Sequence, residues 1–317
     1  SQLAQGVNAI IGAASSGVSL TVIDKITTNG VVQFSPANTA PNLTTYEDNG
    51  LYFRNAPSDV LQGAVLAGKA IDAGIANMAT IARQDPYGEG LAAAVVKDFT
   101  AAGGNITSEL LYDPAAPSFE AEVAEIVAGA PEAVVVVGFD ESTKLIQEMI
   151  KQGAGPDKIQ LYLVDGNAST TAFAEFPAGT MDGTVATFPA GSVDVTSFND
   201  RMLAFDPSLT DFLYGPQSFD ATMLIALAAH QAGCADGTSI AANLISVAGD
   251  GGEECTTYAD CVALIDAGTA IDYMGVNGGS DFNAYGDLLE GTISINEYSS
   301  NTEFEEIGSL TAIVPEP

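Results

Sequence analysis

The sequence predicts a doubly wound α/β fold, and two patterns lead to this prediction. Short apolar runs rich in β-branched residues alternate along the chain with longer segments that carry helix-end signals. Most of these runs are continuously apolar, which is typical of parallel strands buried on both faces of a sheet. We therefore expect strands over 8–12, 30–35, 77–83, 106–112, 132–138, 159–165, 183–188 and 291–298.

Four of the segments between these runs have the end signals of helices. In the first, Ser58 is the expected N-cap, Asp59 lies in the first turn and Gly74 is the expected stop. In two of the others, Ser118 and Ser142 are interpreted as caps. The predicted helices cover 58–74, 89–104, 117–129 and 142–153.

Length and charge narrow the class of protein. The 317 residues suffice for two domains of ordinary size. The chain has 9 Lys and Arg against 41 Asp and Glu, a net charge of −32, which makes nucleic acid and anionic membranes poor partners. We interpret this acidity, which is spread along the chain, as a solubility device that also fits a saline habitat. The most apolar helical stretch, 221–230, is too short to span a membrane.

The three cysteines indicate an oxidising compartment. Cys255 and Cys261 lie six residues apart, between a glycine-rich turn and an amphipathic segment. A metal site would need more Cys or His nearby, and the single histidine is His230. A local disulfide is therefore favoured and no metal is expected. Cys234 is then left over, and its pairing with either of the other two cysteines is the alternative.

No motif in the chain predicts an enzyme. A G-x-S-x-G nucleophile turn and a P-loop are both absent, and His230 lies on an apolar helical pattern with no second histidine to support it. Residues 88–93 (GEGLAA) match a dinucleotide-binding pattern, with Glu109 at about the ribose-binding distance. Glu89 between the two glycines disfavours a pyrophosphate there. We expect neither catalysis nor a cofactor.

Ligand-binding residues are expected in the segments that follow strands. In doubly wound sheets, ligands bind beyond the carboxyl ends of the strands. Here most of those segments are rich in small hydroxylic residues, which suits a small polar ligand. They cover 12–17, 35–44, 83–90, 138–143, 164–170 and 188–192.

Three stretches carry a family resemblance that extends over nearly the whole chain. Residues 9–44 contain SPANTAP, residues 85–90 read DPYGEG, and residues 271–287 read IDYMGVNGGSDFNAYGD. Together they resemble signatures of the type I periplasmic binding proteins. The branch that they resemble is the leucine/isoleucine/valine-binding group of ABC-importer substrate-binding proteins.

The resemblance implies two α/β lobes, joined by three crossovers, that close on a ligand. Lobe 1 is expected over 1–57 and 189–287, and lobe 2 over 58–188 and 288–317, with crossovers near 56–58, 187–190 and 286–289. The first twelve residues have the pattern of a last helical turn, a glycine stop and a strand. By analogy with the family, the initial β-α-β elements of lobe 1, roughly sixty residues, are expected to be missing.

The resemblance also implies how the backbone of an amino acid is held. In lobe 1, the Ala37 carbonyl and the Thr39 hydroxyl align with groups that bind an α-ammonium. Ser16 and the Thr39 N–H align with groups that bind an α-carboxylate. In lobe 2, Asp165 aligns with an acidic partner of the ammonium and is one methylene shorter than the family's Glu. This set of donors and acceptors suits a zwitterionic amino acid.

Other residues are expected to shape the rest of the pocket. Tyr87 and Phe139 are the further ligand-binding residues of lobe 2, and Tyr214 aligns with the side-chain pocket. Asn38 stands where the family commonly has a small apolar residue, which implies a more polar pocket than a leucine site. Arg83 is the single cation in the ligand-side loops and is expected to point away.

The function implied by the resemblance is transport. We expect an extracytoplasmic substrate-binding protein that captures a small amino acid-like ligand between its lobes and delivers it to the membrane permease of an ABC importer. The expected location is periplasmic or extracellular, with a lipid anchor on the missing N-terminus as one option and no direct membrane insertion of this segment. The alternatives are a sensory or regulatory ligand-binding domain of the same fold, and a non-amino-acid ligand such as an amide, urea or a small organic acid.

Overall fold

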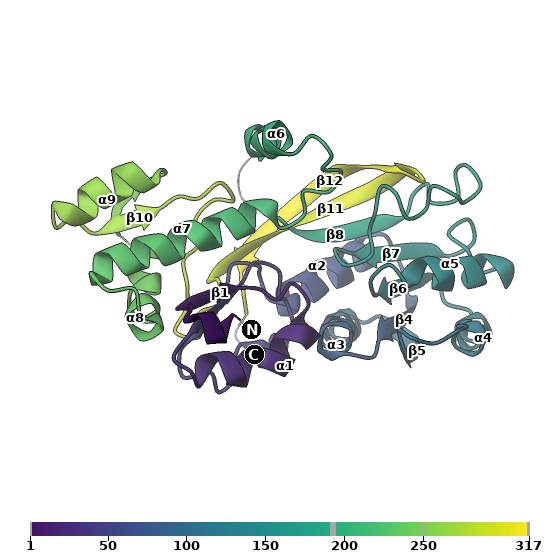
Figure 1. Cartoon of the computed structure of the whole chain (residues 1–317). Coiled ribbons are helices and arrows are strands. Elements are labelled where there is room, and N and C mark those ends of the chain that lie inside the picture. The colour runs from purple at the N-terminus through teal and green to yellow at the C-terminus, as the bar shows by residue number, and fades with distance from the viewer. Residues whose placement is uncertain (1, 191–194, 250, 316–317) are drawn as a thin grey trace. The chain divides into compact units, whose positions relative to one another are not determined.

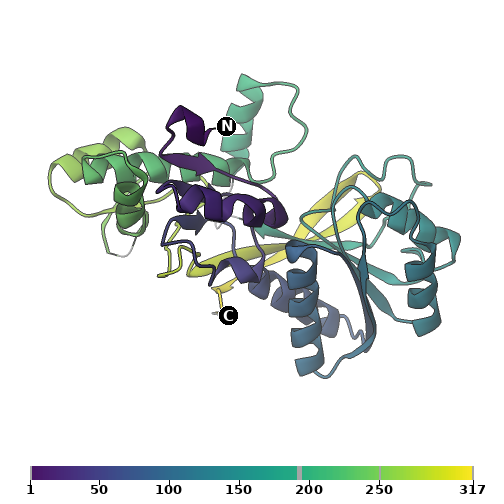
Figure 2. The same ribbon diagram turned by 60° about the horizontal axis from the view of Figure 1, so that its bottom comes forward.

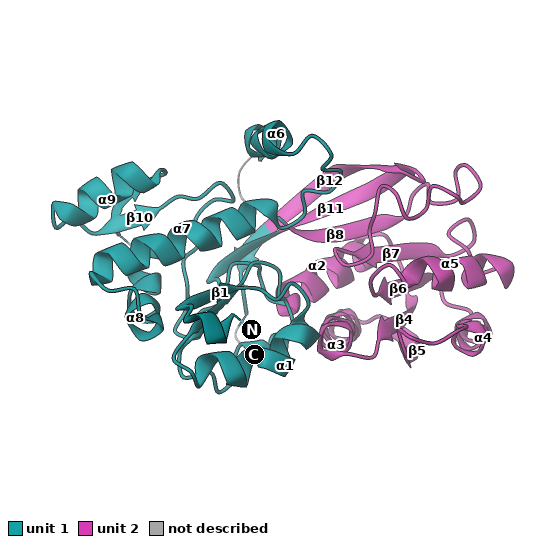
Figure 3. Ribbon diagram, viewed as in Figure 1, with its two compact units in different colours: residues 1–58, 190–292, 311–317 teal, residues 59–189, 293–310 magenta. Residues whose placement is uncertain are grey.

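The computed structural model describes residues 2–190, 195–249 and 251–315, and the chain divides into two compact units. Unit 1 comprises Ser1–Ser58, Ala190–Thr292 and Thr311–Pro317 (Figure 3). Unit 2 comprises Asp59–Pro189 and Ile293–Leu310. The chain therefore passes from one unit to the other after residues 58, 189, 292 and 310.

The expected division into lobes needs correction at its C-terminal end. The third crossing falls inside strand β11 (Glu290–Ser300), a few residues later than expected, and a fourth falls inside β12 (Glu303–Ile313). The two strands are neighbours in one sheet and are joined by only two residues, so the chain turns back on itself. Residues 311–317, which were assigned to the second lobe, consequently return to unit 1.

Unit 2 is built on a seven-stranded sheet of order β12-β11-β8-β7-β6-β4-β5 (Figure 1). The five strands from β4 to β8 pair in parallel. Its other elements are α2 (Asp59–Asp72), β4 (Asn77–Arg83), α3 (Pro86–Ala101), β5 (Asn105–Tyr112), α4 (Glu120–Gly129), β6 (Ala133–Val137), α5 (Ser142–Lys151), β7 (Gln160–Val164) and β8 (Val185–Ala190). The sequence-based prediction of a doubly wound α/β fold is confirmed.

The central strand β6 shows why these strands are continuously apolar. All five of its residues are buried. Val135 and Val137 pack in a core with residues of α2 and α3, whereas Val134 and Val136 pack in a second core with residues of α4 and α5. Successive side chains of a strand point to opposite faces, so a sheet covered on both sides needs apolar residues at every position. Figure 2 shows helices flanking the sheet of unit 2 on both sides.

Unit 1 contains two smaller parallel sheets, β1-β2-β3 and β10-β9. Its elements are η1 (Leu3–Gln5), β1 (Ala9–Ile11), α1 (Ser16–Thr27), β2 (Val32–Ser35), η2 (Pro41–Leu43), β3 (Tyr52–Arg54), α6 (Thr196–Phe205), α7 (Gly215–Ala232), α8 (Gly237–Ala248), β9 (Glu253–Cys255), α9 (Tyr258–Asp266) and β10 (Ile271–Tyr273). Val32 and Phe34 of β2 pack in a core with apolar residues of α7 and α8. Gln33, between them, points to the opposite face of the sheet and is fully buried.

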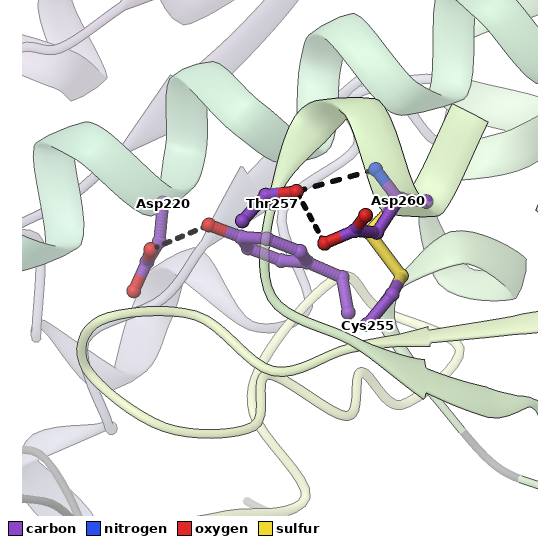
Figure 4. Close-up of a disulfide and its surroundings, with 6 residues drawn as sticks. Asp220, Cys255, Thr257 and Asp260 are labelled. Atoms are coloured by element: carbon purple, nitrogen blue, oxygen red, sulfur yellow. Dashed lines mark hydrogen bonds between the residues drawn. A yellow bond between two sulfur atoms is a disulfide. The ribbon is translucent and has the colours of Figure 1, made fainter. Parts of the chain in front are cut away.

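The expected local disulfide is confirmed. Cys255, the last residue of β9, is bonded to Cys261 in the first turns of α9, and their Cα atoms are 5.3 Å apart (Figure 4). Thr257 lies between them and caps α9, because its Oγ1 accepts from the Asp260 N–H at 3.2 Å. Cys234 is exposed and forms no disulfide, which resolves the alternative pairings.

One local expectation, the helix cap at Ser142, is wrong, and the disfavoured dinucleotide match at 88–93 lies inside a helix. Residues 88–93 lie within α3, and a side-chain carbon at Gly88 would come within 2.2 Å of the Arg83 carbonyl oxygen. This glycine allows close packing of the helix against the end of β4 rather than forming a phosphate loop. Ser142 does not cap α5, whose N-cap is Glu141. Instead, the Ser142 Oγ is buried and accepts from the Asn167 side chain at 3.1 Å.

Ser118 lies one residue before the N-cap of α4, where its Oγ accepts from the Glu120 N–H at 3.3 Å. His230 is at the surface of unit 1, where its Nε2 is 2.8 Å from Asp266. Over the described ranges of the chain, no helix has the length and apolarity needed to cross a bilayer, and no group of His, Cys, Asp and Glu is placed to hold a metal ion.

Candidate functional site

The loop that follows β2 in unit 1 is held by a serine at the end of the strand. The Ser35 Oγ accepts from the backbone N–H groups of Ala37 and Asn38, at 3.2 and 3.0 Å. The same oxygen donates to the Ala13 carbonyl at 2.7 Å. Residues 37–40 are nine-tenths buried or more, so their backbone groups need such partners. The hydroxylic character of this segment is thus explained first by the pairing of its own backbone.

Ser16 and Thr39, predicted to bind one carboxylate, lie next to each other. Ser16 begins α1, and its Oγ accepts from the N–H groups of Thr39 and Ala40, both at 3.3 Å. These bonds are long, and the Ser16 hydroxyl hydrogen is itself a donor. Helix starts also favour negative charge because their first N–H groups are unpaired. Unit 1 therefore gathers several hydrogen-bond donors around this point.

Asn38 has a different role from the one expected. Its side-chain amide donates to the carbonyls of Ala13 and Ala14, at 3.1 and 2.8 Å. Its amide oxygen accepts from the Tyr52 hydroxyl at 2.9 Å. Burial raises the pKa of Tyr52 far above its usual value, so the phenol remains a donor. Asn38 is fully buried, and its amide links the loop after β2 to residues 13 and 14 and to β3.

A buried ion pair supports the same loop of unit 1. The Arg54 guanidinium, at the end of β3, donates to both carboxylate oxygens of Asp287, each at 2.7 Å. It also donates to the Ala40 carbonyl at 2.9 Å and to the Thr44 hydroxyl at 2.8 Å. The Thr44 hydroxyl in turn donates to Asp287 at 2.6 Å. Both charged side chains are almost fully buried, so the pair fixes the loop where Thr39 lies.

In unit 2, the side chains of Tyr87 and Gln62 meet that of Asp165, which lies directly after β7. The Asp165 carboxylate is 7% exposed, and its Oδ1 accepts from the Tyr87 hydroxyl and from the Gln62 side-chain amide, both at 3.0 Å. Tyr87 lies in the first turn of α3, and Gln62 lies near the start of α2. The convergence of these segments at the carboxyl ends of the strands agrees with the sequence-based expectation.

Phe139, after β6, forms an apolar wall beside this carboxylate. Its ring stacks on that of Tyr87, with the centroids 5.4 Å apart and the planes within 10°. The Arg83 guanidinium lies 3.9 Å from the centroid of the Phe139 ring. Its Nε is 2.6 Å from Asp85 and its Nη1 is 2.8 Å from Glu141, so two carboxylates offset its charge. Arg83 therefore belongs to the support of Phe139.

Tyr214 belongs to unit 1, where it is the N-cap residue of α7. Its backbone is left-handed, with φ at 60°, which is uncommon for a residue with a side chain. Its carbonyl accepts from the N–H and the hydroxyl of Ser218, at 3.0 and 2.7 Å. Of the eight predicted ligand residues, the structure brings together Ser16, Ala37, Asn38 and Thr39 in unit 1, and Tyr87, Phe139 and Asp165 in unit 2.

The comparisons with known proteins agree with this geometry. The model of the family described as the receptor family ligand binding region matches residues 1–301. The chain belongs to this family, the type I periplasmic binding proteins.

Relatives and solved structures of the same kind match most of the chain. Leu/Ile/Val-binding protein homolog 1 of Brucella suis is 31% identical over 75% of this chain. The chemotactic signal transduction system substrate-binding protein BasB of Halobacterium salinarum is 28% identical over 87% of it. The chain spans 64% and 66% of the lengths of these two relatives, somewhat less than two thirds of each.

The fold match is closer than the sequence match. The leucine-binding protein LivK of Thermotoga maritima aligns with a TM-score of 0.79 at 19% identity, over 96% of this chain and 80% of that structure. At this identity the match supports the fold of a type I periplasmic binding protein and carries no information about the ligand.

Two supporting features of this periplasmic binding protein were missed from the sequence. Gln62 lies among apolar residues in a predicted helix, where a polar residue is normally expected to face solvent. Arg54 and Asp287 are 233 residues apart, and no local pattern links them. The only local signal for the pair is a charged residue at the end of an apolar strand, because burying a charge requires a partner.

Proposed function

We propose that this chain is the ligand-binding part of an extracytoplasmic substrate-binding protein that captures an amino acid-like molecule for the permease of an ABC importer. The observation that carries the proposal is the Asp165 carboxylate of unit 2. It is nearly buried, it is fixed by Tyr87 and Gln62, and the stacked pair of Tyr87 and Phe139 lies beside it. A fixed carboxylate next to an apolar wall suits an ammonium group attached to a small organic ligand.

Unit 1 supports the same ligand class from its own side chains. The Ser16 hydroxyl and the N–H groups of residues 39 and 40 are donors gathered near a helix start, and the nearby Arg54 guanidinium is paired with Asp287. We assign the carboxylate of the ligand to these donors. The Ala37 carbonyl, the Thr39 hydroxyl and Asp165 are assigned to its ammonium, and Tyr214 to its side chain. The proposal includes no catalytic step and no cofactor.

The relatives support the proposed partner and location. The Brucella relative is named for binding leucine, isoleucine and valine, and a substrate-binding protein of an importer works with a membrane permease. A periplasmic or extracellular location, with or without a lipid anchor, agrees with the disulfide of unit 1, because such bonds persist in oxidising compartments. The acidic surface gives no support for a nucleic-acid partner.

Direct binding measurements test the proposal. The full-length protein is screened by thermal shift against amino acids, amides, urea and small organic acids, and the hits are measured by calorimetry. Asp165→Ala is expected to lose about 2 kcal/mol or more of affinity for an amino acid, and less for the analogue without the ammonium. Asp182→Ala, at an exposed carboxylate of unit 2, is the matched control and should bind normally. Equal losses for both ligands, or tight binding of a plain dicarboxylate, would contradict the proposal.

A sensory role is the second candidate, because the Halobacterium relative is named as part of a chemotactic signalling system. Deleting the gene distinguishes the two roles, because an importer protein is needed for uptake of the ligand and a sensory protein for chemotaxis toward it. Deletion in the source organism should abolish uptake of the ligand if the chain serves an importer. Loss of chemotaxis toward the ligand, with uptake unchanged, would favour the sensory role.

A further inference from the structure

We propose that Gln62 recognises the ligand together with Asp165. Its side-chain amide fixes the Asp165 carboxylate, and its Oε1 accepts a hydrogen bond from the ligand group that Asp165 binds. This inference rests on the proposed function and extends it to a residue outside the predicted site. It also narrows the ligand class, because the bound group must supply at least two hydrogen-bond donors, as a primary ammonium does.

The donors of the Gln62 amide are fully used inside unit 2. Its Nε2 is 3.0 Å from the Asp165 Oδ1, 3.2 Å from the Thr187 carbonyl and 3.1 Å from the Thr187 hydroxyl. A carboxylate and a carbonyl can only accept, so the nitrogen side of the amide must face them. Gln62 thereby joins the end of β7 to β8 and holds the carboxylate in one orientation.

The acceptor of the same amide is left without a partner. Among the described residues, no group donates to the Gln62 Oε1, and this atom is shielded from solvent. A buried carbonyl that forms no hydrogen bond costs about 1–3 kcal/mol of stability. Because the amide orientation is fixed by its donors, the Oε1 cannot exchange places with the nitrogen to relieve this cost. A ligand that brings an N–H to this oxygen removes the penalty on binding.

Charge makes an ammonium the group that fits both acceptors. The Asp165 Oδ1 receives two hydrogen bonds from neutral donors, Tyr87 and Gln62, which fix its direction. The neighbouring Gln62 oxygen adds a neutral acceptor on the same network. A primary ammonium carries three donors and a positive charge, so it can serve a carboxylate and an amide oxygen together. A carboxylic acid ligand offers neither.

The first test compares ligands that differ in their donors. Gln62→Met keeps the approximate volume and removes both functions of the amide. We expect about a tenfold loss of affinity for the amino acid and little change for its analogue without the ammonium. The wild type should also lose more affinity than Gln62→Met when the ligand nitrogen is dimethylated. Gln160→Met is the control, because Gln160 lies at the other end of β7 and donates to the carbonyls of Leu161 and Gly183.

The second test needs no ligand and checks the coupling between Gln62 and Asp165 on which the inference depends. Gln62→Glu places a second carboxyl group beside Asp165, and two close carboxylates raise the pKa of one of them in the folded state. Because a raised folded-state pKa favours the protonated form, the extra destabilisation is absent at low pH and grows as pH rises through that pKa. Urea unfolding of Gln62→Glu should therefore show a loss relative to wild type that increases between about pH 5 and pH 8. Asp165→Asn in the Gln62→Glu background should remove this trend.

The outcomes separate the two proposals. Binding of amino acids with equal affinity by wild type and Gln62→Met, or equal losses for ligands with and without the ammonium, overturns the role of Gln62 and leaves the proposed function intact. Absence of any amino-acid binding by the wild type overturns the proposed function. A pH trend in Gln62→Glu that persists after Asp165→Asn overturns the coupling between the two residues.

Discussion

The two units hold their parts of the candidate site on buried polar side chains of different kinds. In unit 1 the support is a charged pair, Arg54 with Asp287, whose hydrogen bonds extend to the loop that carries Thr39. In unit 2 it is a neutral amide, Gln62, with one buried atom that has no hydrogen-bond partner among the described residues. Arg54 and Gln62 lie on either side of the first crossing of the chain, after residue 58. The same short segment therefore carries a supporting residue of each unit.

This difference suggests a division of roles. A buried ion pair with satisfied hydrogen bonds keeps a single geometry, because every alternative leaves a charge without a partner. We infer that the loop of unit 1 is preorganised before the ligand arrives. The Gln62 Oε1 of unit 2 gains its hydrogen bond only when a further donor is present, so we infer that ligand binding stabilises unit 2 at this point.

The largest expected effect comes from breaking the charged pair. Asp287→Asn leaves the Arg54 guanidinium buried without its counter-charge, and we expect unit 1 to lose about 3–5 kcal/mol of unfolding free energy in urea. Asp157→Asn is the matched control, since Asp157 forms an exposed ion pair with Lys158 in unit 2 and should change stability by less than about 1 kcal/mol. Similar losses in the two variants would show that the buried pair does not support unit 1 as described.

The Cys255–Cys261 disulfide is expected to stabilise unit 1, whose sheets are smaller than that of unit 2. Unit 1 has sheets of three and two strands, and Cys255–Cys261 links one of them to α9, whereas unit 2 has a seven-stranded sheet. Replacing both cysteines by serine should cost about 2 kcal/mol, a modest value because the closed loop is short. Cys234→Ser should have no effect, and thiol titration of the unfolded, unreduced protein should find one free thiol. Three free thiols would rule the bond out.

Gln33 is one of four side chains in the described part of unit 1, with Asn55, Asn199 and Gln217, that have a buried polar atom without a hydrogen-bond partner. Both polar atoms of its side chain are buried and, within the described part of the chain, have no hydrogen-bond partner. Gln33→Met keeps the approximate volume and removes the desolvated amide, so it should raise the unfolding free energy by about 1 kcal/mol or more. Gln152→Met, at an amide that donates to Glu148 and to the Glu120 carbonyl, should give no gain. A destabilised Gln33→Met would show that the amide is hydrogen-bonded in the folded protein and contributes to its stability.

The sequence was sufficient for what depends on local patterns. The strand at 77–83 was predicted with its observed bounds because apolar residues and turn signals mark both ends. The segments that contain SPANTAP and Asp165 were singled out because they follow strands, and the resemblance to the family supplied the roles of their residues. The strand β12 was missed because most of its residues are exposed and several are glutamates, so it lacks the apolar run of a buried strand. The role of Asn38 depends on the Tyr52 hydroxyl and on carbonyls 24 and 25 residues away, which no local pattern contains.

Salt should produce the smallest difference between the units, although it affects both. Unit 1 has 19 acidic and 3 basic residues and unit 2 has 22 and 6, so each has a net charge of −16. Raising the ionic strength from about 0.1 M to about 1 M shortens the screening length from about 10 Å to about 3 Å, which weakens repulsion among the carboxylates. We expect hydrogen exchange of β6 amides in unit 2 and of α7 amides in unit 1 to slow together, by similar factors. If only one unit were stabilised, the repulsion would depend on how carboxylates cluster within that unit rather than on its net charge. A measurement showing no slowing in either unit would mean that the acidic surface serves solubility without opposing the folded state.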